Sequence, residues 1–154
     1  MSLGRHFHVG IIVEDLGGAR TRLTELLGVD WGPVIENDIE VRDAVGNERV
    51  LPNAICYSTE APYLELILET AGTPWTRNEH SNLHHIGFFS GALDAESGRL
   101  NTAGCPLELM GGHGDGPPAG WAYHRDPLGV RVEIVDEAMR ASMEEFLFRP
   151  PPPR

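Results

Sequence analysis

Short apolar runs alternate with polar, turn-rich stretches along the whole chain, and a helical pattern occurs once in each half. An apolar, β-rich run at His8–Val13 precedes leucines at near-helical spacing over Leu16–Leu27, and Gly28 then ends the helical pattern. Turn pairs, among them Pro52-Asn53, separate the strands that are predicted next. Those strands are Ile39–Val41, Ala54–Ser58 and Tyr63–Leu68. The first half therefore predicts a βαβββ unit.

The second half predicts the same order of elements. A strand at His85–Phe89 leads to a helix at Leu93–Ala103. Three strands complete the half: Leu107–Met110, Trp121–His124 and Val130–Val135. Beyond them, apolar spacing predicts a helix over Asp136–Phe148, and Pro150–Arg154 is predicted as an extended or disordered end.

The two halves also resemble each other in sequence. Shifting the chain by the 77 residues that separate His8 from His85 aligns these histidines and also aligns Gly10 with Gly87. A second alignment sets residues 63–67 against residues 131–135, and both segments are centred on a glutamate between apolar residues. Because the matches keep their order and centre on a histidine or a glutamate, they favour an internal duplication over coincidence.

The predicted domain organisation follows from this repeat. The first βαβββ module covers residues 5–71, a polar linker covers 72–83, and the second module covers 84–136. A C-terminal helix and proline-rich tail occupy residues 137–154. Within the second module, Gly111–Gly120 holds five glycines in ten residues and is predicted to be a mobile loop.

Composition narrows the possible environments and partners. The 154 residues are enough to bury a core, so a metal would serve chemistry rather than folding. The net charge of −11 makes nucleic acid and anionic membranes poor partners. Two cysteines without metal-site spacing favour a reducing compartment, and no signal peptide or long apolar stretch is present. These features predict a soluble, cytoplasmic protein.

Four segments carry a resemblance to a known family: FHVGIIVEDL (7–16), YLELI (63–67), LHHIGF (83–88) and HRDPLGVRVEIVD (124–136). With them the chain resembles the vicinal oxygen chelate superfamily, which includes glyoxalase I, methylmalonyl-CoA epimerase, extradiol dioxygenases and fosfomycin-resistance proteins. The resemblance implies an α+β fold in which two tandem βαβββ modules form a cupped, half-barrel mixed sheet with the helices outside. It also implies four metal ligands, one on the first and one on the last strand of each module: His8, Glu65, His85 and Glu133.

Strand geometry agrees with these ligands. Because side chains alternate across a strand, Glu65 shares a face with Tyr63 and Ile67, whereas the neighbouring leucines face the helix. A buried carboxylate needs a compensating charge, which a divalent cation would supply. Two imidazoles and two carboxylates suit Ni, Zn, Co, Mn or Fe(II). His84 is a rival to His85 but lies on the opposite strand face. Taken singly, each of these residues is more often an ordinary core or sheet-edge residue.

The predicted chemistry is proton transfer next to a metal-bound carbonyl, with Glu133 and Glu65 as both ligands and candidate bases. The fourth ligand and the short chain favour an isomerase, epimerase or glyoxalase-like lyase over a dioxygenase. The resemblance leaves the substrate open between acyl-CoA thioesters and hemithioacetals, and it implies a homodimer. A metal-free drug-binding protein of the bleomycin-resistance type is the alternative, as is a dioxygenase. Four more residues keep open roles: His113, Glu36, Glu40 and Glu48.

Overall fold

The computed structural model describes residues 3–150 and confirms the predicted α+β fold of two successive βαβββ modules. The elements of the first module are β1 (His6–Val13), α1 (Leu16–Leu27), β2 (Ile35–Asp43), β3 (Glu48–Tyr57) and β4 (Tyr63–Leu68). Those of the second are β5 (Leu83–Ser90), α2 (Leu93–Thr102), β6 (Leu107–Gly111), β7 (Trp121–Arg125) and β8 (Arg131–Asp136). Every strand and helix predicted for the two modules is present.

Strands β2 and β3 are longer than predicted, and the expected turn at Pro52-Asn53 lies inside β3. Most residues of β2 before Val41 are exposed, so this part of the strand has no apolar alternation to reveal it. The described β3–β4 pairing covers Ile55 to Tyr57, beyond Pro52. A proline fits a strand where its missing N–H is not required by a neighbouring strand.

The helix predicted over Asp136–Phe148 is shorter in the structure than expected. A single 3-10 turn, η1 (Glu137–Met139), comes first and is capped by the Asp136 side chain, which accepts from the Ala138 N–H. The α-helix α3 (Arg140–Phe146) is only two turns long. Of the predicted tail, residues 151–154 lie outside the described part of the chain.

The chain divides into two compact units that do not coincide with the two modules. Within the described residues, the His8 unit consists of residues 8–37, 52–84 and 141–150. The His85 unit consists of residues 3–7, 38–51 and 85–140. The module boundaries inferred from the repeat, 5–71 and 84–136, therefore remain a prediction from the sequence.

In the His8 unit, β1 runs parallel to β4, and β4 is antiparallel to β3. Helix α1 packs against β4, and its N-terminus is capped by the Asp15 carboxylate. One side of the sheet forms an apolar cluster with the helix, in which the fully buried Leu66 packs with the buried residues Leu16 and Trp31. Leu64 and Leu68 pack against the same cluster, as the strand alternation predicts.

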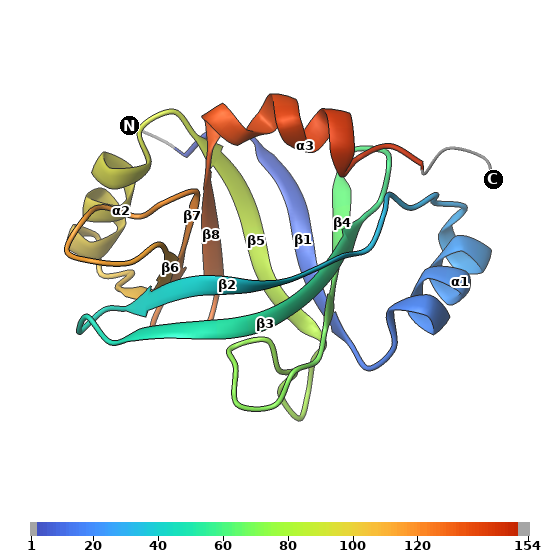
Figure 1. Cartoon of the computed structure of the whole chain (residues 1–154), viewed down its shortest axis with the longest axis horizontal. Helices are drawn as coiled ribbons and strands as arrows, with labels where there is room; N and C mark the ends of the chain where they lie inside the picture. Colours follow the sequence, from blue (N-terminus) through green and yellow to red (C-terminus); the bar gives the residue numbers. More distant parts are fainter. Residues whose placement is uncertain (1–2, 151–154) are drawn as a thin grey trace. The chain divides into compact units, whose positions relative to one another are not determined.

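In the His85 unit, β5 runs parallel to β8. The next pairs of neighbouring strands are antiparallel: β8 with β7, β7 with β6, and β6 with β2. Helix α2 packs across β6, β7 and β8 (Figure 1). Leu93 and Leu100 of the helix contact a cluster that includes Ala122 and Ile134 of the sheet. Both units thus bury one sheet face under a helix.

The internal repeat is visible in the strand register. Gly10, two residues after His8, pairs with Glu65, and Gly87, two residues after His85, pairs with Glu133. Each module therefore places a histidine and a glutamate on adjacent parallel strands at the same relative register.

No helix between residues 3 and 150 combines the length and apolar content needed to cross a bilayer. The longest helix, α1, has 12 residues. A spanning helix needs about 20 residues, most of them apolar.

Candidate functional site

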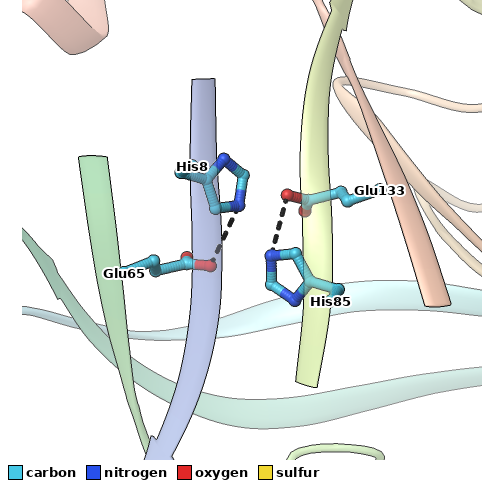
Figure 2. Close-up of side chains that lie close together, drawn as sticks. All are labelled: His8, Glu65, His85 and Glu133. Atoms are coloured by element: carbon cyan, nitrogen blue, oxygen red, sulfur yellow. Dashed lines mark ion pairs between the residues drawn. The ribbon is translucent and has the colours of Figure 1, made fainter. Parts of the chain in front are cut away.

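The first candidate pair lies in the His8 unit. His8 Nε2 is 3.4 Å from Glu65 Oε2, and both side chains are buried (Figure 2). The pair results from the parallel pairing of β1 and β4, whose opposite faces are occupied by the apolar cluster under α1. The positions of His8 and Glu65 therefore follow from the pairing of two strands and need no contribution from loops.

Tyr57 completes this pair and was missed by the sequence analysis. Its hydroxyl donates a hydrogen bond of 2.8 Å to Glu65 Oε1, and its ring lies edge-on to His8 with centroids 5.6 Å apart. Tyr57 pairs directly with Glu65 in the β3–β4 register. The only sequence signal was a tyrosine in the predicted strand that precedes the glutamate strand. Because Oε1 accepts from Tyr57, the orientation of the Glu65 carboxylate is fixed.

The second candidate pair lies in the His85 unit. His85 Nε2 is 3.3 Å from Glu133 Oε2, and both side chains are buried (Figure 2). Tyr123 pairs with Glu133 in the β7–β8 register, and its ring centroid is 5.1 Å from that of His85. Arg131 lies over the Tyr123 ring while donating to both carboxylate oxygens of Glu108, at 2.6 and 2.8 Å. The second pair thus also has a tyrosine opposite its glutamate.

His84, the rival to His85, has a different role. Its Nε2 lies 2.9 Å from the carbonyl oxygen of Pro74. Since a carbonyl only accepts, Nε2 carries the proton and donates to it. The His84 side chain therefore connects strand β5 to the segment around Pro74.

The two pairs have the donor chemistry of a divalent-cation site. Each of the four residues is buried and offers an imidazole nitrogen or a carboxylate oxygen as a ligand atom. Glu65 Oε2 and Glu133 Oε2 lie 3.4 and 3.3 Å from the Nε2 atoms of His8 and His85, and both glutamates are buried. Burial of an ionised carboxylate oxygen is costly without a compensating positive charge. Imidazole and carboxylate together suit Zn, Ni, Co, Mn and Fe(II), so the residues fit a divalent ion.

A cavity of about 600 Å³ opens in the His85 unit. Trp121 lines it, and the Trp121 ring lies 4.8 Å from that of Tyr123. A Cβ at Gly111 would lie 2.9 Å from Trp121 Nε1 and 2.4 Å from the Ala119 carbonyl oxygen, so glycine leaves room for the indole. The remaining lining residues are Asp38, Ile39, Glu40, Val50, Gly112, Gly120 and Met139. This volume is within the range of small-molecule pockets.

Three of the four residues with open roles lie together beside the glycine loop. His113 Nδ1 is 3.9 Å from Glu40 Oε2, and the backbone N–H of Gly114 donates to Glu48. These three residues also line a smaller cavity of about 290 Å³. The fourth, Glu36, is exposed on β2. The loop residue His113 is itself largely exposed, so the cluster is a solvated rim.

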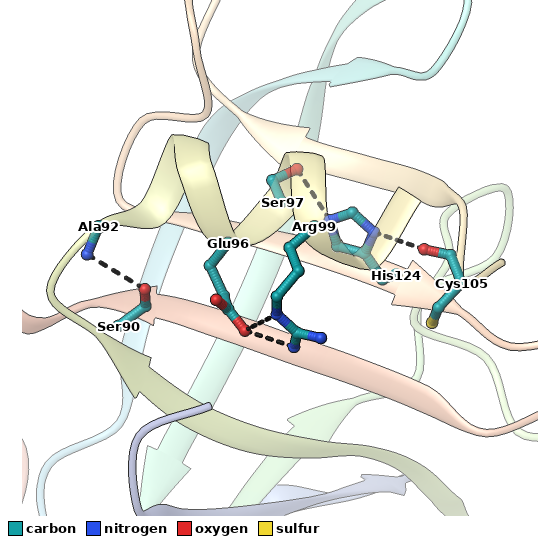
Figure 3. Close-up of polar contacts among 7 residues, drawn as sticks. All are labelled: Ser90, Ala92, Glu96, Ser97, Arg99, Cys105 and His124. Atoms are coloured by element: carbon teal, nitrogen blue, oxygen red, sulfur yellow. Dashed lines mark hydrogen bonds and ion pairs between the residues drawn. The ribbon is translucent and has the colours of Figure 1, made fainter. Parts of the chain in front are cut away.

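Buried polar groups under α2 are structural. His124 is fully buried, with Nδ1 2.9 Å from the Cys105 carbonyl oxygen and Nε2 2.9 Å from Ser97 Oγ (Figure 3). Nδ1 must donate to the carbonyl, so the Ser97 hydroxyl donates to Nε2. Burial lowers the pKa of His124 and keeps the ring neutral. This chain of hydrogen bonds connects the helix to the sheet.

The cysteines are poor candidates for nucleophilic catalysis. Burial raises the pKa of the Cys56 thiol to about 11. It also raises the pKa of Cys105, which is buried in the cluster under α2. Because the thiolate is the reactive form, neither residue is activated.

Comparison with solved structures identifies the fold. A variant of Streptomyces coelicolor methylmalonyl-CoA epimerase in complex with 2-nitronate-propionyl-CoA is 20% identical, with a TM-score of 0.62 over 89% of this chain and 99% of that one. The epimerase from Mycobacterium tuberculosis is 19% identical, with a TM-score of 0.62 over 92% and 94%. The hypothetical protein BH1468 from Bacillus halodurans C-125 is 15% identical, with a TM-score of 0.57 over 86% and 94%. At these identities the likeness shows a common fold.

Comparison with family profiles and curated proteins gives one result each. No curated protein matches the chain. The profile of the glyoxalase/bleomycin resistance protein/dioxygenase superfamily matches residues 7–125, most of the chain. The matched segment contains three of the four candidate ligands, His8, Glu65 and His85. The chain therefore belongs to the glyoxalase/bleomycin resistance protein/dioxygenase superfamily.

Proposed function

We propose that the two His–Glu pairs together hold one divalent cation, and that the protein is an isomerase, epimerase or glyoxalase-like lyase that moves a proton next to a carbonyl. The observation that carries this proposal is the repetition of a buried His–Glu pair at the same strand register in both modules. Each pair supplies two ligands, which is half of a four-ligand set. A duplicated module that contributes half a site explains why the same pair occurs twice.

Within this site, the surroundings of Glu133 favour it as the base that takes up the substrate proton. Glu65 Oε1 already accepts from the Tyr57 hydroxyl, which holds that carboxylate in place as a ligand. Glu133 pairs with Tyr123, and Tyr123 contacts Trp121 at the cavity. When bound, a divalent cation would polarise the carbonyl oxygen and make the neighbouring C–H more acidic. Glu133 is 7% exposed, and this burial would exclude bulk water from the proton transfer.

The cavity beside Trp121 is the proposed position of the substrate. The indole offers an apolar face and an N–H donor, and Met139 adds apolar surface. Two carboxylates, Asp38 and Glu40, also line the cavity, so it carries negative charge. The candidate substrates are acyl-CoA thioesters and glutathione hemithioacetals, the first because the structural neighbours include methylmalonyl-CoA epimerases.

The experiment that tests this function is exchange of a substrate hydrogen with solvent. A substrate with an acidic α-hydrogen is incubated with metal-loaded protein in deuterium oxide, and loss of the α-proton signal is followed by NMR. We expect exchange with at least one acyl-CoA thioester or hemithioacetal, even where net turnover is slow. Absence of exchange together with tight binding of an unrelated apolar compound by metal-free protein would support the drug-binding alternative instead.

We also propose that the protein forms a homodimer, as the sequence resemblance implies. Light scattering coupled to size exclusion should then report twice the mass of the chain at micromolar concentration. A uniform monomer under these conditions would contradict this assembly.

A further inference from the structure

Phe148 is buried although it lies beyond α3. Only 5% of its surface is exposed. Its ring stacks on Tyr63 with centroids 3.9 Å apart and planes 18° from parallel. It also meets Tyr57 edge-on, at 5.2 Å and 74°. Aromatic contacts in these two geometries are both favourable, so Phe148 restrains both tyrosine rings.

Backbone contacts, two of them within the segment and one with Gly32, define the path of the segment that carries Phe148. The N–H groups of Leu147 and Phe148 both donate to the Met143 carbonyl oxygen, at 2.8 and 3.0 Å. The Leu147 carbonyl passes so close to Gly32 that a Cβ there would lie 1.8 Å from its oxygen. Met143 is itself 5% exposed. The position of Phe148 is therefore defined by backbone contacts as well as by its ring.

Tyr57 links this segment to a candidate metal ligand. The Tyr57 ring, 4% exposed, contacts Phe148 on its edge, and its hydroxyl donates to Glu65 Oε1. If the ring could tilt, the hydroxyl would lose its alignment with the carboxylate, because a hydrogen bond weakens steeply with angle. Groups that orient a ligand in this way typically change metal affinity about 10–100-fold when they are removed.

We propose that Phe148 is a positioning residue that acts through Tyr57 to orient Glu65 for the divalent cation. This inference rests on the proposed function, because it assumes that Glu65 is a metal ligand. The residue belongs to the C-terminal segment, outside residues 7–125 that match the family profile. A residue outside the profile match thus supports a candidate ligand, Glu65, that lies inside it.

The test measures metal affinity rather than activity. Competition with a fluorescent chelator gives the Kd for Zn²⁺ and Co²⁺ of the wild type, Phe148→Ala, Tyr57→Phe and the double variant. We expect each single variant to bind about tenfold more weakly. The double variant should bind no more weakly than Tyr57→Phe, because Phe148 acts through the same hydroxyl. Phe146→Ala is the matched control, since Phe146 is an aromatic residue of α3 that is 61% exposed.

A second route displaces the segment without changing either aromatic residue. Gly32→Ala places a Cβ against the Leu147 carbonyl and should weaken binding as much as Phe148→Ala does. Phe148→Leu keeps most of the packing volume and replaces Phe148→Ala in the test if that variant fails to fold. Its Kd for the metal ion should lie between those of the wild type and Tyr57→Phe.

The outcomes separate the two proposals. A wild type that binds neither ion contradicts the proposed function itself. If the wild type binds the ion and both Phe148→Ala and Phe148→Leu bind it with the wild-type Kd, the proposed role of Phe148 is overturned. The proposed metal site is then unaffected. Additive losses in the double variant also overturn it, because Phe148 would then act by a route that does not include Tyr57.

Discussion

The two His–Glu pairs occupy the same strand register, but different side chains surround them. In the His8 unit, Phe148 packs over the tyrosine that holds Glu65. In the His85 unit, Trp121 connects the equivalent tyrosine to a cavity of about 600 Å³. The two modules thus share a buried His–Glu pair, while the tyrosine beside the pair contacts an aromatic side chain of the C-terminal segment in one unit and a cavity-lining indole in the other.

The largest expected effect separates the two glutamates. Glu133→Gln should lower the rate of α-hydrogen exchange about 10²–10⁴-fold, because it removes the base while keeping the side-chain size. Glu65→Gln should act first on metal affinity. Exchange and metal content are measured in the same sample for each variant. Wild-type exchange in Glu133→Gln that retains its metal would exclude Glu133 as the base and make Glu65 the candidate.

A smaller effect tests the cavity. Trp121→Ala should raise the KM of a confirmed substrate about tenfold, with a lesser effect on kcat, because it removes apolar contact area rather than a reacting group. Val130→Ala, an exposed apolar residue of the same unit, is the control and should leave KM unchanged. Equal KM values for Trp121→Ala and the wild type would place the substrate elsewhere.

The smallest effect concerns the charge at the cavity. Asp38→Asn and Glu40→Gln should lower the KM for a coenzyme A thioester several-fold at low ionic strength, since fewer negative charges face its phosphates. The matching pantetheine thioester lacks those phosphates and should show no change. At high salt, where exposed charges are screened, the variants and the wild type should have the same KM for the coenzyme A thioester. A change of equal size with both thioesters would point to a structural cause.

Much of the fold could be predicted from the sequence because apolar periodicity records which side of each element is buried. The alternation around Glu65 and the leucines facing α1 are examples. The outer part of β2 was underestimated because its residues are exposed on both sides. A strand without a buried face leaves no alternating pattern.

The surroundings of the candidate site were harder to predict than its ligands. The ligands came from a resemblance and a repeat, which are properties of the sequence. The contact of Phe148 with Tyr57 joins residues that are distant in the chain, and its apolar character indicated only a helix. The predicted strand Trp121–His124 already places Trp121 and Tyr123 on one face, but nothing local in the sequence shows that Trp121 lines a cavity, since that depends on the backbone at Gly111.

The central claim is that the two pairs hold one ion together, and metal stoichiometry tests it most directly. Elemental analysis after mild purification and reloading should give close to one divalent ion per chain. His8→Ala and His85→Ala should each lower the affinity for that ion, with circular dichroism near wild type, because loss of one ligand weakens binding without removing the core. Two ions per chain, or metal content unaffected by either substitution, would contradict the account.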